Sequence, residues 1–477
     1  MEKLIGRNRE IAELERCLSS ERSEFVVVSG RRRIGKTFLV NTVLKGRTTM
    51  SFVGSHKSPK ARQLQKFAQA MQQSALCDVL PQLTSWYDAF DVLEAALSKC
   101  DVGIKKVLFF DEMPWIDTPG SEFVAALEDF WNGWASLRDD IMLVACGSAT
   151  SWLVDQLIEN QGGLHNRVTS RIALQPFNLN ECKQYVESKS GTWDYYQIAQ
   201  MYMYLGGVPF YWSLLDFTKG IAENVDELFF TPSAKLKGEF GELYQVLFRN
   251  SQPYVDIVRQ IAMRREGLSR QEIVDATGTS GGTLTKMLAN LERCNFIMAQ
   301  TPLDNKRNGN IYRVCDFYTL FYFRFIEPER QNTLHYWTTK ITSPSVSAWQ
   351  GLTFELIGLL HIDQIRMALG IYGVSVRCSS WRSTNNAEGP GAQIDLVIER
   401  ADRITHLCEF KFAPDEYVIT SDYARRLRER MSVYRSQAKK RNTLLITFVT
   451  PFGVSKGKNY SVVQGDITLP QLFAPAM

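Results

Sequence analysis

Short apolar runs alternate with amphipathic stretches in the first half of the chain. Apolar residues fill positions 25–28, 107–110 and 141–146, and each run has the length of a buried strand. In the stretch 10–18, apolar residues stand at 11, 14 and 18, which is the spacing of one helix face. Buried strands that alternate with helices are typical of an α/β fold with a parallel sheet.

The pattern changes in the second half of the chain. Short amphipathic helices are predicted between about 240 and 330, followed by strands at 295–300 and 311–314. After a linker at 341–346, residues 349–355 are predicted to open a helix. Two further strands, at 393–398 and 404–411, are separated by a turn and predict a hairpin. The chain therefore holds more than one kind of domain.

Composition narrows the class of protein. The 477 residues are too many for one core, and 45% hydrophobic with 22% charged residues is typical of globular proteins. A net charge of +4 is too small to indicate a partner, and the nine cysteines show no metal-ligand spacing. The chain starts without an apolar signal segment and has no run long enough for a membrane span. We therefore expect a cytoplasmic protein that does not contact the membrane.

The sequence GRRRIGKT follows the first apolar run directly and leads into a predicted helix. A strand, a glycine-containing turn and a helix start together form an anion site, because backbone amides and the helix dipole point at the ligand. The lysine can reach the β- and γ-phosphates of ATP, and the threonine hydroxyl can bind Mg²⁺. The predicted ATP-binding residues of this loop are Gly30, Arg31, Arg32, Arg33, Ile34, Gly35, Lys36 and Thr37.

Polar residues end the next two predicted strands. Asp111 can hold Mg²⁺, and Glu112 can orient and polarise the attacking water as a catalytic residue. Ser148 follows the strand at 141–146 and can sense the γ-phosphate; the alternative is that it caps the following helix. Arg167 is predicted as a catalytic arginine finger, acting within the chain or on a neighbour, with Arg171 as its competitor.

The order of these motifs, together with a Gly-Gly-Val-Pro sequence at 206–209, resembles the archaeal-type ATPases of the STAND/AAA-related superfamily. The resemblance covers residues 1 to about 240. It implies that Pro209 lies near the nucleotide, at a mobile lid. An ordinary helix-breaking turn is the alternative for 207–209.

The middle segment resembles a winged helix-turn-helix. A capping box at Ser269 and Glu272 starts one of its helices. The recognition helix would present Thr283, Thr285 and Lys286, and the hairpin tip would carry Lys306 and Arg307. The ATPase resemblance implies a coupling module within the chain, and because basic residues are few, this role is favoured over direct reading of DNA.

The C-terminal hairpin carries the second set of candidate residues. Side chains alternate faces along a strand, so Glu409 and Lys411 point to the same side and Asp395 can meet them across the hairpin. Two carboxylates that hold a divalent metal beside a lysine suit phosphodiester hydrolysis. The pattern resembles the PD-(D/E)XK nuclease superfamily, and this resemblance adds Glu355 as an acidic metal ligand on the first helix. A structural hairpin with a solvated ion pair is the alternative.

A basic stretch at 423–441 follows and could contact DNA phosphates, although such charge runs often only face solvent. We expect four segments: a P-loop ATPase core at 1–175, a helical lid at 176–245, a winged helix-turn-helix with its connector at 246–340, and a nuclease-like domain at 341–477. The predicted function is an ATP-hydrolysing, Mg²⁺-dependent switch that controls DNA cleavage, with DNA as partner and a homo-oligomer as a further expectation. A non-cleaving regulatory or DNA-binding protein is the alternative.

Overall fold

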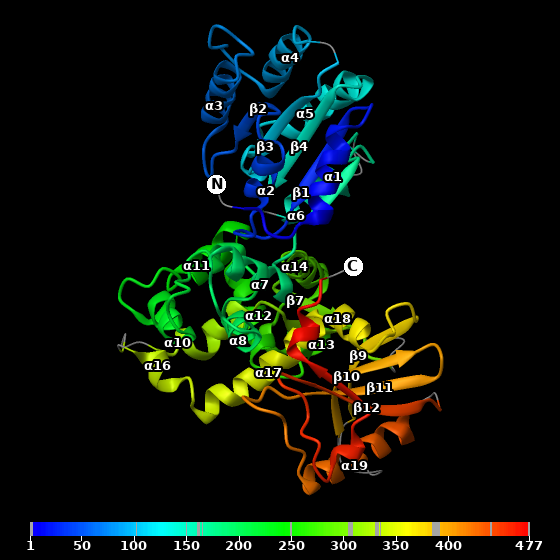
Figure 1. The fold of residues 1–477 in the computed structure, drawn as a ribbon. Coiled ribbons are helices and arrows are strands. Elements are labelled where there is room, and N and C mark those ends of the chain that lie inside the picture. The colour runs from blue at the N-terminus through cyan, green and yellow to red at the C-terminus, as the bar shows by residue number, and fades with distance from the viewer. Residues whose placement is uncertain are drawn as a thin grey trace. The chain divides into compact units, whose positions relative to one another are not determined.

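A computed structural model describes residues 3–101, 103–148, 150–159, 163, 164, 166–248, 250–303, 309–329, 333, 335–383, 392–438 and 441–475. The chain divides into two compact units (Figure 1). The first comprises Met1–Pro176 with Gln245–Arg249, and the second comprises Phe177–Tyr244 with Asn250–Met477. The second unit spans the boundaries predicted near 245 and 340. The division into two units does not test these two boundaries, which stay predictions.

The first unit is built on a five-stranded sheet with the order β2-β3-β4-β1-β5, in which every neighbouring pair is parallel. The predicted α/β parallel-sheet core is confirmed. The strands are β1 Glu24–Ser29, β2 Thr48–Val53, β3 Lys106–Asp111, β4 Ile141–Gly147 and β5 Ser170–Ala173. The helices include α1 Asn8–Leu18, α2 Lys36–Val43, α3 Lys60–Gln73, α4 Trp86–Leu97, α5 Phe123–Gly133 and α6 Thr150–Leu153, with short turns η1 Met113–Trp115, η2 Ala135–Leu137 and η3 Val154–Ile158.

Two apolar cores cover the two faces of this sheet. Phe25 and Val27 of β1 enter one core, whereas Val26 and Val28 enter the other. Successive side chains of a strand point to opposite faces, so a central strand with a core on each side must be apolar at every position. This requirement explains the continuous apolar runs of β1, β3 and β4.

The second unit begins with helices that pack around buried aromatic residues. Phe321, Phe325, Trp337 and Trp349 are buried together with Tyr204. Phe317 and Tyr318 of the same stretch are buried as well. The elements are α7 Leu179–Ser188, α8 Tyr195–Leu205, α9 Pro209–Trp212, α10 Ile221–Val225, η4 Asp226–Phe230, α11 Glu239–Leu247, α15 Phe317–Phe321, η5 Tyr322–Ile326 and α16 Tyr336–Lys340.

The middle segment contains the helices α12, α13 and α14 and a small antiparallel sheet of order β6-β8-β7. Ser269 and Glu272 form the predicted capping box at the start of the second helix. The turn that carries Lys306 and Arg307 lies outside the described residues. The elements are α12 Gln252–Ala262, β6 Leu268–Ser269, α13 Arg270–Thr277, α14 Gly281–Arg293, β7 Ile297–Gln300 and β8 Ile311–Val314.

A second five-stranded sheet, of order β13-β12-β11-β10-β9, ends the chain. The pairs β9/β10 and β10/β11 are antiparallel, which confirms the predicted hairpin, and β11/β12 and β12/β13 are parallel. The elements are α17 Pro344–Leu360, α18 Ile362–Ala368, β9 Val376–Ser383, β10 Ala392–Arg400, β11 Ile404–Phe410, α19 Ser421–Gln437, β12 Thr443–Thr450, η6 Tyr460–Val462, β13 Gly465–Thr468 and α20 Leu469–Leu472.

One predicted boundary differs in the structure. The helix expected to open at Trp349 begins at Pro344, inside the segment taken as a linker. Ser343 caps it by accepting a hydrogen bond from the Val346 amide, and proline suits the first helical position because its missing N–H needs no partner there. Serine and proline therefore start a helix here instead of marking a loop.

No helix among the described residues is long and apolar enough to cross a lipid bilayer.

Candidate functional sites

Three strand ends of the first unit bring the predicted ATP-binding residues together. β4 lies between β1 and β3, and parallel strands place their carboxyl ends at one edge of the sheet. Gly30 follows β1, Asp111 ends β3 and Ser148 follows β4. The loop after β1 leads into the amino terminus of α2, which begins at Lys36.

Two glycines give the loop its shape. Gly30 has φ of +143° and lies so close to the chain after β5 that a Cβ atom would come within 2.7 Å of the Leu174 carbonyl oxygen. Gly35 has φ of +87° and precedes α2. Side chains other than glycine rarely adopt such φ values, so both positions require the glycines that the motif provides.

Lys36 and Thr37 are bonded to the polar strand ends. The Lys36 ammonium donates hydrogen bonds to the Arg31 carbonyl oxygen at 2.9 Å and to Ser148 Oγ at 3.1 Å. Thr37 Oγ1 donates to Asp111 Oδ2 at 2.7 Å. The two predicted Mg²⁺ ligands of this site are therefore in direct contact.

Glu112 completes this cluster. Ser148 Oγ, which accepts the bond from Lys36, donates to Glu112 Oε1 at 3.0 Å. Glu112 has φ of 47°, in the left-handed region, where a glutamate backbone is strained. A chain of hydrogen bonds thus joins the lysine, the serine and the glutamate.

The predicted arginine fingers lie apart from this cluster. Arg167 is exposed in the turn before β5, and Arg171 is exposed on β5. Within the part of the chain that the structure describes, neither side chain bonds to Lys36, Asp111 or Glu112. Pro209 belongs to the second unit, where it begins α9, so its proximity to the nucleotide stays a prediction.

The C-terminal hairpin brings the second set of predicted residues together. Leu396 pairs with Cys408, so Asp395 and Glu409 are the next positions along β10 and β11. The Lys411 ammonium lies 3.6 Å from Glu409 Oε2. The β9/β10 register shifts between Ile394 and Val397, so Asp395 sits at an irregular point of its strand. Such bulges re-aim side chains.

Three side chains that the sequence did not predict bind these carboxylates. Arg265, between α12 and β6, donates to Glu355 Oε1 at 2.5 Å and lies 3.8 Å from Asp395 Oδ1. Glu409 accepts hydrogen bonds from Arg430 and from the Tyr423 hydroxyl, both at 2.7 Å.

The sequence held an indication for one of these partners only. Arg430 lies on α19 at helical spacing from the buried Tyr423, Leu427 and Tyr434, so an arginine within this apolar stripe indicates a buried acidic partner. Arg265 lies in a short polar connection that has no periodicity. Nothing local pointed to its contact with Glu355.

Burial and repulsion disfavour negative charge in this cluster. Burial raises the pKa of Glu355, and the charge of Asp395 adds to this effect. The pKa of Asp395 is raised by burial and then by Glu409, while Lys411 and Arg265 oppose the rise. A divalent cation would relieve this repulsion, since carboxylates are its preferred ligands.

A metal set of three acidic residues is not assembled in the structure. Among the described residues, no group of three or more His, Cys, Asp and Glu side chains could hold a metal ion. Mg²⁺ commonly uses only one or two carboxylates and keeps several waters. Asp395 and Glu409 on adjacent strands fit that requirement, whereas Glu355 is bonded to Arg265.

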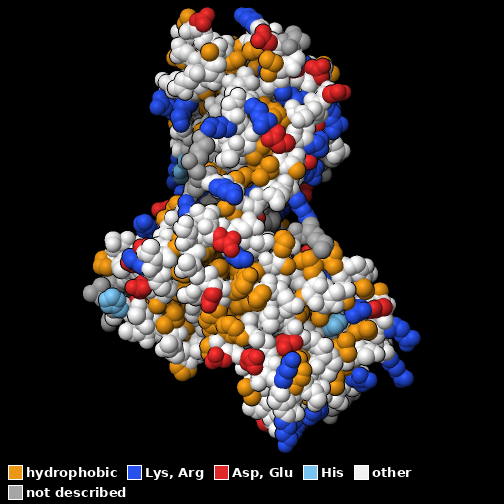
Figure 2. Space-filling model, in the orientation of Figure 1, with side chains coloured by type: hydrophobic (Ala, Val, Ile, Leu, Met, Phe, Trp, Pro, Cys, Tyr) orange, Lys and Arg blue, Asp and Glu red, His pale blue; other side chains and the backbone are white. Residues whose placement is uncertain are grey.

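Two further surfaces carry residues predicted to meet DNA. Thr283, Thr285 and Lys286 are exposed on α14. On the face shown in Figure 2, basic side chains gather over the end of the second unit that contains α19. Several of them are paired with acids of the same helix, because Arg425 bonds to both Asp422 and Glu429.

Residues 4–215 match the model of a family described as an ATPase domain predominantly from Archaea. This part of the chain is an archaeal-type ATPase domain, and its parallel sheet and phosphate loop agree with that class. An uncharacterised protein of Methanocaldococcus jannaschii is 24% identical over 335 residues, which cover 68% of this chain and 69% of the relative.

Two solved structures are similar to about two thirds of this chain. The Walker-type ATPase of Pyrococcus abyssi is 18% identical, with a TM-score of 0.47, and the match covers 66% of this chain and 95% of that one. The ORC2 protein of Aeropyrum pernix is 15% identical, with a TM-score of 0.40, over 65% of this chain and 90% of the other.

Proposed function

We propose that this protein binds and hydrolyses ATP with Mg²⁺ in its first unit, and that the nucleotide controls a Mg²⁺-dependent DNA-cleaving site in its second unit. The observation that carries the proposal is the presence of two separate polar clusters. One joins Lys36, Thr37 and Asp111 at a phosphate loop, and the other joins Asp395 and Glu409 beside a lysine.

In the first site, the loop amides and Lys36 would bind the phosphates of ATP, and Thr37 and Asp111 would hold Mg²⁺. When bound, the cation would supply neutralisation of the charge that develops on the transferred phosphoryl group. Glu112 would orient the attacking water. In the structure Lys36 donates to Ser148, and Ser148 donates to Glu112. A γ-phosphate would compete for Lys36, so Ser148 can report its presence to the catalytic glutamate.

Arg167 is the proposed arginine finger. It is exposed and bonds to none of the site residues within its own described chain, which suits action on the ATP of a neighbouring copy and a homo-oligomer. Arg171 remains its competitor. We place Pro209 at the lid over the nucleotide, on the resemblance of its Gly-Gly-Val-Pro sequence alone.

In the second unit, α17 and the mixed sheet carry the acidic residues in the arrangement of the PD-(D/E)XK resemblance, which supports a nuclease-like domain. Asp395 and Glu409 would hold Mg²⁺, with Glu355 beside them and Lys411 positioned to orient water. The cation would supply an activated water and charge neutralisation. The helices α12 to α14 and the sheet β6-β8-β7 support a winged helix that couples the ATPase to this domain.

Plasmid cleavage with Mg²⁺ and ATP tests the nuclease. We expect Asp395→Ala and Lys411→Ala to abolish nicking, while Asp402→Ala, an exposed carboxylate in the turn of the same hairpin, retains it. Lys36→Ala should remove the dependence of cleavage on ATP. Nicking that survives Asp395→Ala would disprove the catalytic assignment.

One observation favours a second candidate, a non-cleaving regulatory protein with an inactive nuclease-like domain. Glu355 and Glu409 are already bonded to Arg265 and Arg430, and these arginines compensate charge that a metal would otherwise neutralise. Calorimetric titration with Mg²⁺ or Mn²⁺ separates the candidates. A cation site that Asp395→Ala removes supports the nuclease, and its absence supports the regulatory protein.

A DNA-binding regulator would instead use the exposed residues of α14. Lys286→Ala should then weaken a salt-dependent gel shift of duplex DNA, while Arg428→Ala on α19 should not. The reverse result would assign DNA contact to the basic helix.

A further inference from the structure

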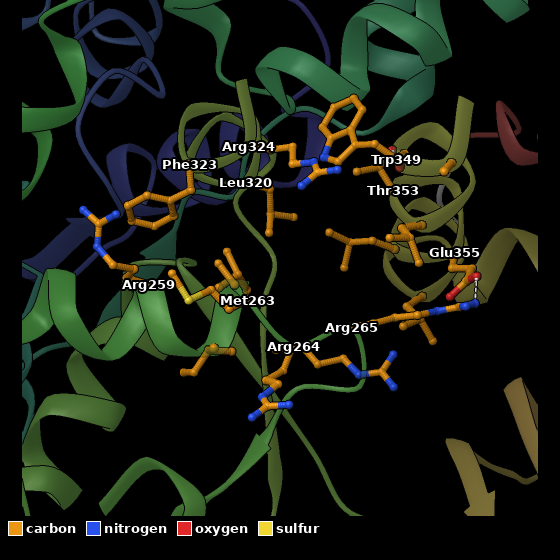
Figure 3. A pocket seen from close by; sticks show the side chains of 18 of the residues that line it. Arg259, Met263, Arg264, Arg265, Leu320, Phe323, Arg324, Trp349, Thr353 and Glu355 are labelled. Carbon is orange, nitrogen blue, oxygen red and sulfur yellow. Dashed lines mark hydrogen bonds and ion pairs between the residues drawn. The ribbon is translucent and has the colours of Figure 1, made fainter. Parts of the chain in front are cut away.

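A pocket of about 560 Å³ opens in the second unit beside Glu355. It is lined by the end of α12 and the following connection, by α15 and η5, and by α17 (Figure 3). Figure 3 shows Arg324 reaching in from η5 near Trp349, with Arg264 and Arg265 on the opposite side. Pockets of this size hold small ligands in proteins.

The charges of the pocket are unequal. Its charged lining residues are five arginines and two glutamates, namely Arg259, Arg264, Arg265, Arg313, Arg324, Glu327 and Glu355. Two of the arginines are paired, since Arg259 bonds to Glu327 and Arg265 to Glu355. Positive charge therefore exceeds negative charge in this space.

The other three arginines have no acid within ion-pair distance among the described residues. Arg313 donates only to neutral oxygens, the Glu266 carbonyl at 3.1 Å and Ser380 Oγ at 3.2 Å. Burial lowers the pKa of Arg313, while the charges of Glu355 and Asp395 oppose this shift. Arg264 and Arg324 are exposed at the pocket and can turn toward a ligand.

The rest of the lining is apolar and partly aromatic. Phe323 carries the Arg259 guanidinium over its ring at 4.5 Å, and Leu352 and Met263 are exposed. Guanidinium groups bind phosphate in a two-pronged geometry, and flat apolar surfaces accept nucleobases. A phosphorylated nucleotide combines both features in one ligand of suitable size.

We propose that this pocket binds a phosphorylated nucleotide, with Arg264, Arg313 and Arg324 as the candidate partners of its phosphate and with its base against Phe323 and Leu352. Two sources share this chemistry, a nucleotide of a DNA strand and a free nucleotide. The strand source rests on the proposed nuclease function, because the ligand would lie beside Glu355. The free-nucleotide source does not depend on that function.

The test uses the full chain with Lys36→Ala, which disables the phosphate loop of the first unit. The two probes are a fluorescent, 5′-phosphorylated single-stranded oligothymidylate, followed by anisotropy, and thymidine monophosphate, followed by calorimetry. Both are measured in EDTA, so that no cleavage can occur. A second protein carries Arg264→Ala and Arg324→Ala in addition to Lys36→Ala. A control protein instead carries Arg403→Ala, in the exposed turn between β10 and β11, together with Lys36→Ala.

We expect the double arginine variant to bind at least one of the two probes about tenfold more weakly than the Lys36→Ala protein, or not at all, and with a shallower salt dependence. The control variant should bind both probes as the Lys36→Ala protein does. Loss of oligonucleotide binding alone assigns the strand, and loss of monophosphate binding assigns the free nucleotide. No binding of either probe, or equal binding by all three proteins, would overturn the proposal. Thermal unfolding verifies that each variant is folded.

These outcomes are independent of cleavage. If the wild-type protein never nicks DNA but the arginine variant loses monophosphate binding, the pocket stands and the nuclease proposal fails. If nicking is lost with Asp395→Ala but probe binding is unchanged by Arg264→Ala and Arg324→Ala, the nuclease proposal is supported and the pocket proposal is disproved.

Discussion

The phosphate-loop site and the carboxylate site hold their polar side chains differently. In the first unit, Lys36 is bonded to Ser148, and Thr37 to Asp111. In the second unit, Glu355 and Glu409 are bonded to Arg265 and Arg430. The polar side chains of the first site are thus bonded to one another, whereas two carboxylates of the second site are bonded to arginines outside the motif.

This difference follows from where the residues lie. In the ATPase site, Asp111, Glu112 and Ser148 lie at or next to the ends of β3 and β4. The loop after β1 leads directly to Lys36 and Thr37 at the start of α2, so the sheet and this one loop bring the residues together. The carboxylates lie on α17 and on an antiparallel hairpin, and their arginines come from a connection and from α19. The second site can therefore be altered without touching its motif.

Replacement of Lys36 should have the largest effect on activity and would test the phosphate-loop site. Without its ammonium, the loop loses the charge that we propose contacts the transferred phosphate. We expect Lys36→Ala to lower ATP turnover by roughly 100-fold or more, measured as phosphate release. Lys99→Ala, an exposed lysine of the same unit, is the matched control. Turnover within twofold of wild type would disprove the assignment of the loop.

Acid should weaken the second unit through His361, at the end of the helix that carries Glu355. Its Nδ1 lies 2.8 Å from the Ile357 carbonyl oxygen, and its Nε2 accepts a bond from the Leu179 amide. Burial lowers the pKa of His361 to about 4. Between pH 6.5 and 4, His361 therefore binds a proton in the unfolded chain but stays neutral in the folded chain. The free energy of unfolding falls as the pH falls through this range.

This loss should reach about 3 kcal/mol at pH 4 and be absent above pH 6.5. Denaturant unfolding followed across this range measures it. His361→Gln removes the titrating group, so the variant should show a smaller slope with pH. The same slope in both proteins would contradict the assignment to His361.

The dependence of the carboxylate site on remote partners can be tested at α19. Arg430→Ala leaves the buried Glu409 without its arginine, and Arg430 is itself about one-third exposed. We expect the free energy of unfolding to fall by about 2–3 kcal/mol. Arg425→Ala on the same helix breaks only exposed ion pairs and should leave stability unchanged. Equal effects of the two substitutions on stability would show that the carboxylate site does not depend on Arg430.

The smallest expected effect concerns Ser148, which joins Lys36 to Glu112. Ser148→Ala removes a hydrogen bond to each charged partner but leaves the loop intact. We expect turnover to fall by about tenfold, with ATP affinity little changed. Stopped-flow binding and steady-state turnover separate these two quantities. An equal loss of affinity would show that Ser148 shapes the phosphate loop instead.

Much of the fold could be predicted because its local patterns are strong. The strands β1, β3 and β4 are apolar at nearly every position, and the β10–β11 hairpin shows two short strands around a polar turn. Strand β6 has only two residues, and β9 and β13 mix polar and apolar residues, so the hydrophobic periodicity did not predict them.

The motifs of the two sites could also be predicted, but their environment could not. Arg265 and Glu355 are 90 residues apart along the chain, and Arg265 lies in an irregular connection. Such a contact depends on how whole elements pack, which no local spacing records. The pocket that contains both residues was invisible in the sequence for the same reason.

The backbone of Glu112 has a consequence for any attempt to improve this protein. A left-handed conformation costs a residue other than glycine roughly 1–2 kcal/mol. Close packing fixes the backbone here, since a Cβ atom on Gly54 would come within 2.5 Å of the Glu112 carbonyl oxygen. A search for thermostable variants should therefore favour glycine at position 112. The same replacement would remove the carboxylate proposed to orient water, so gained stability and lost turnover would appear together.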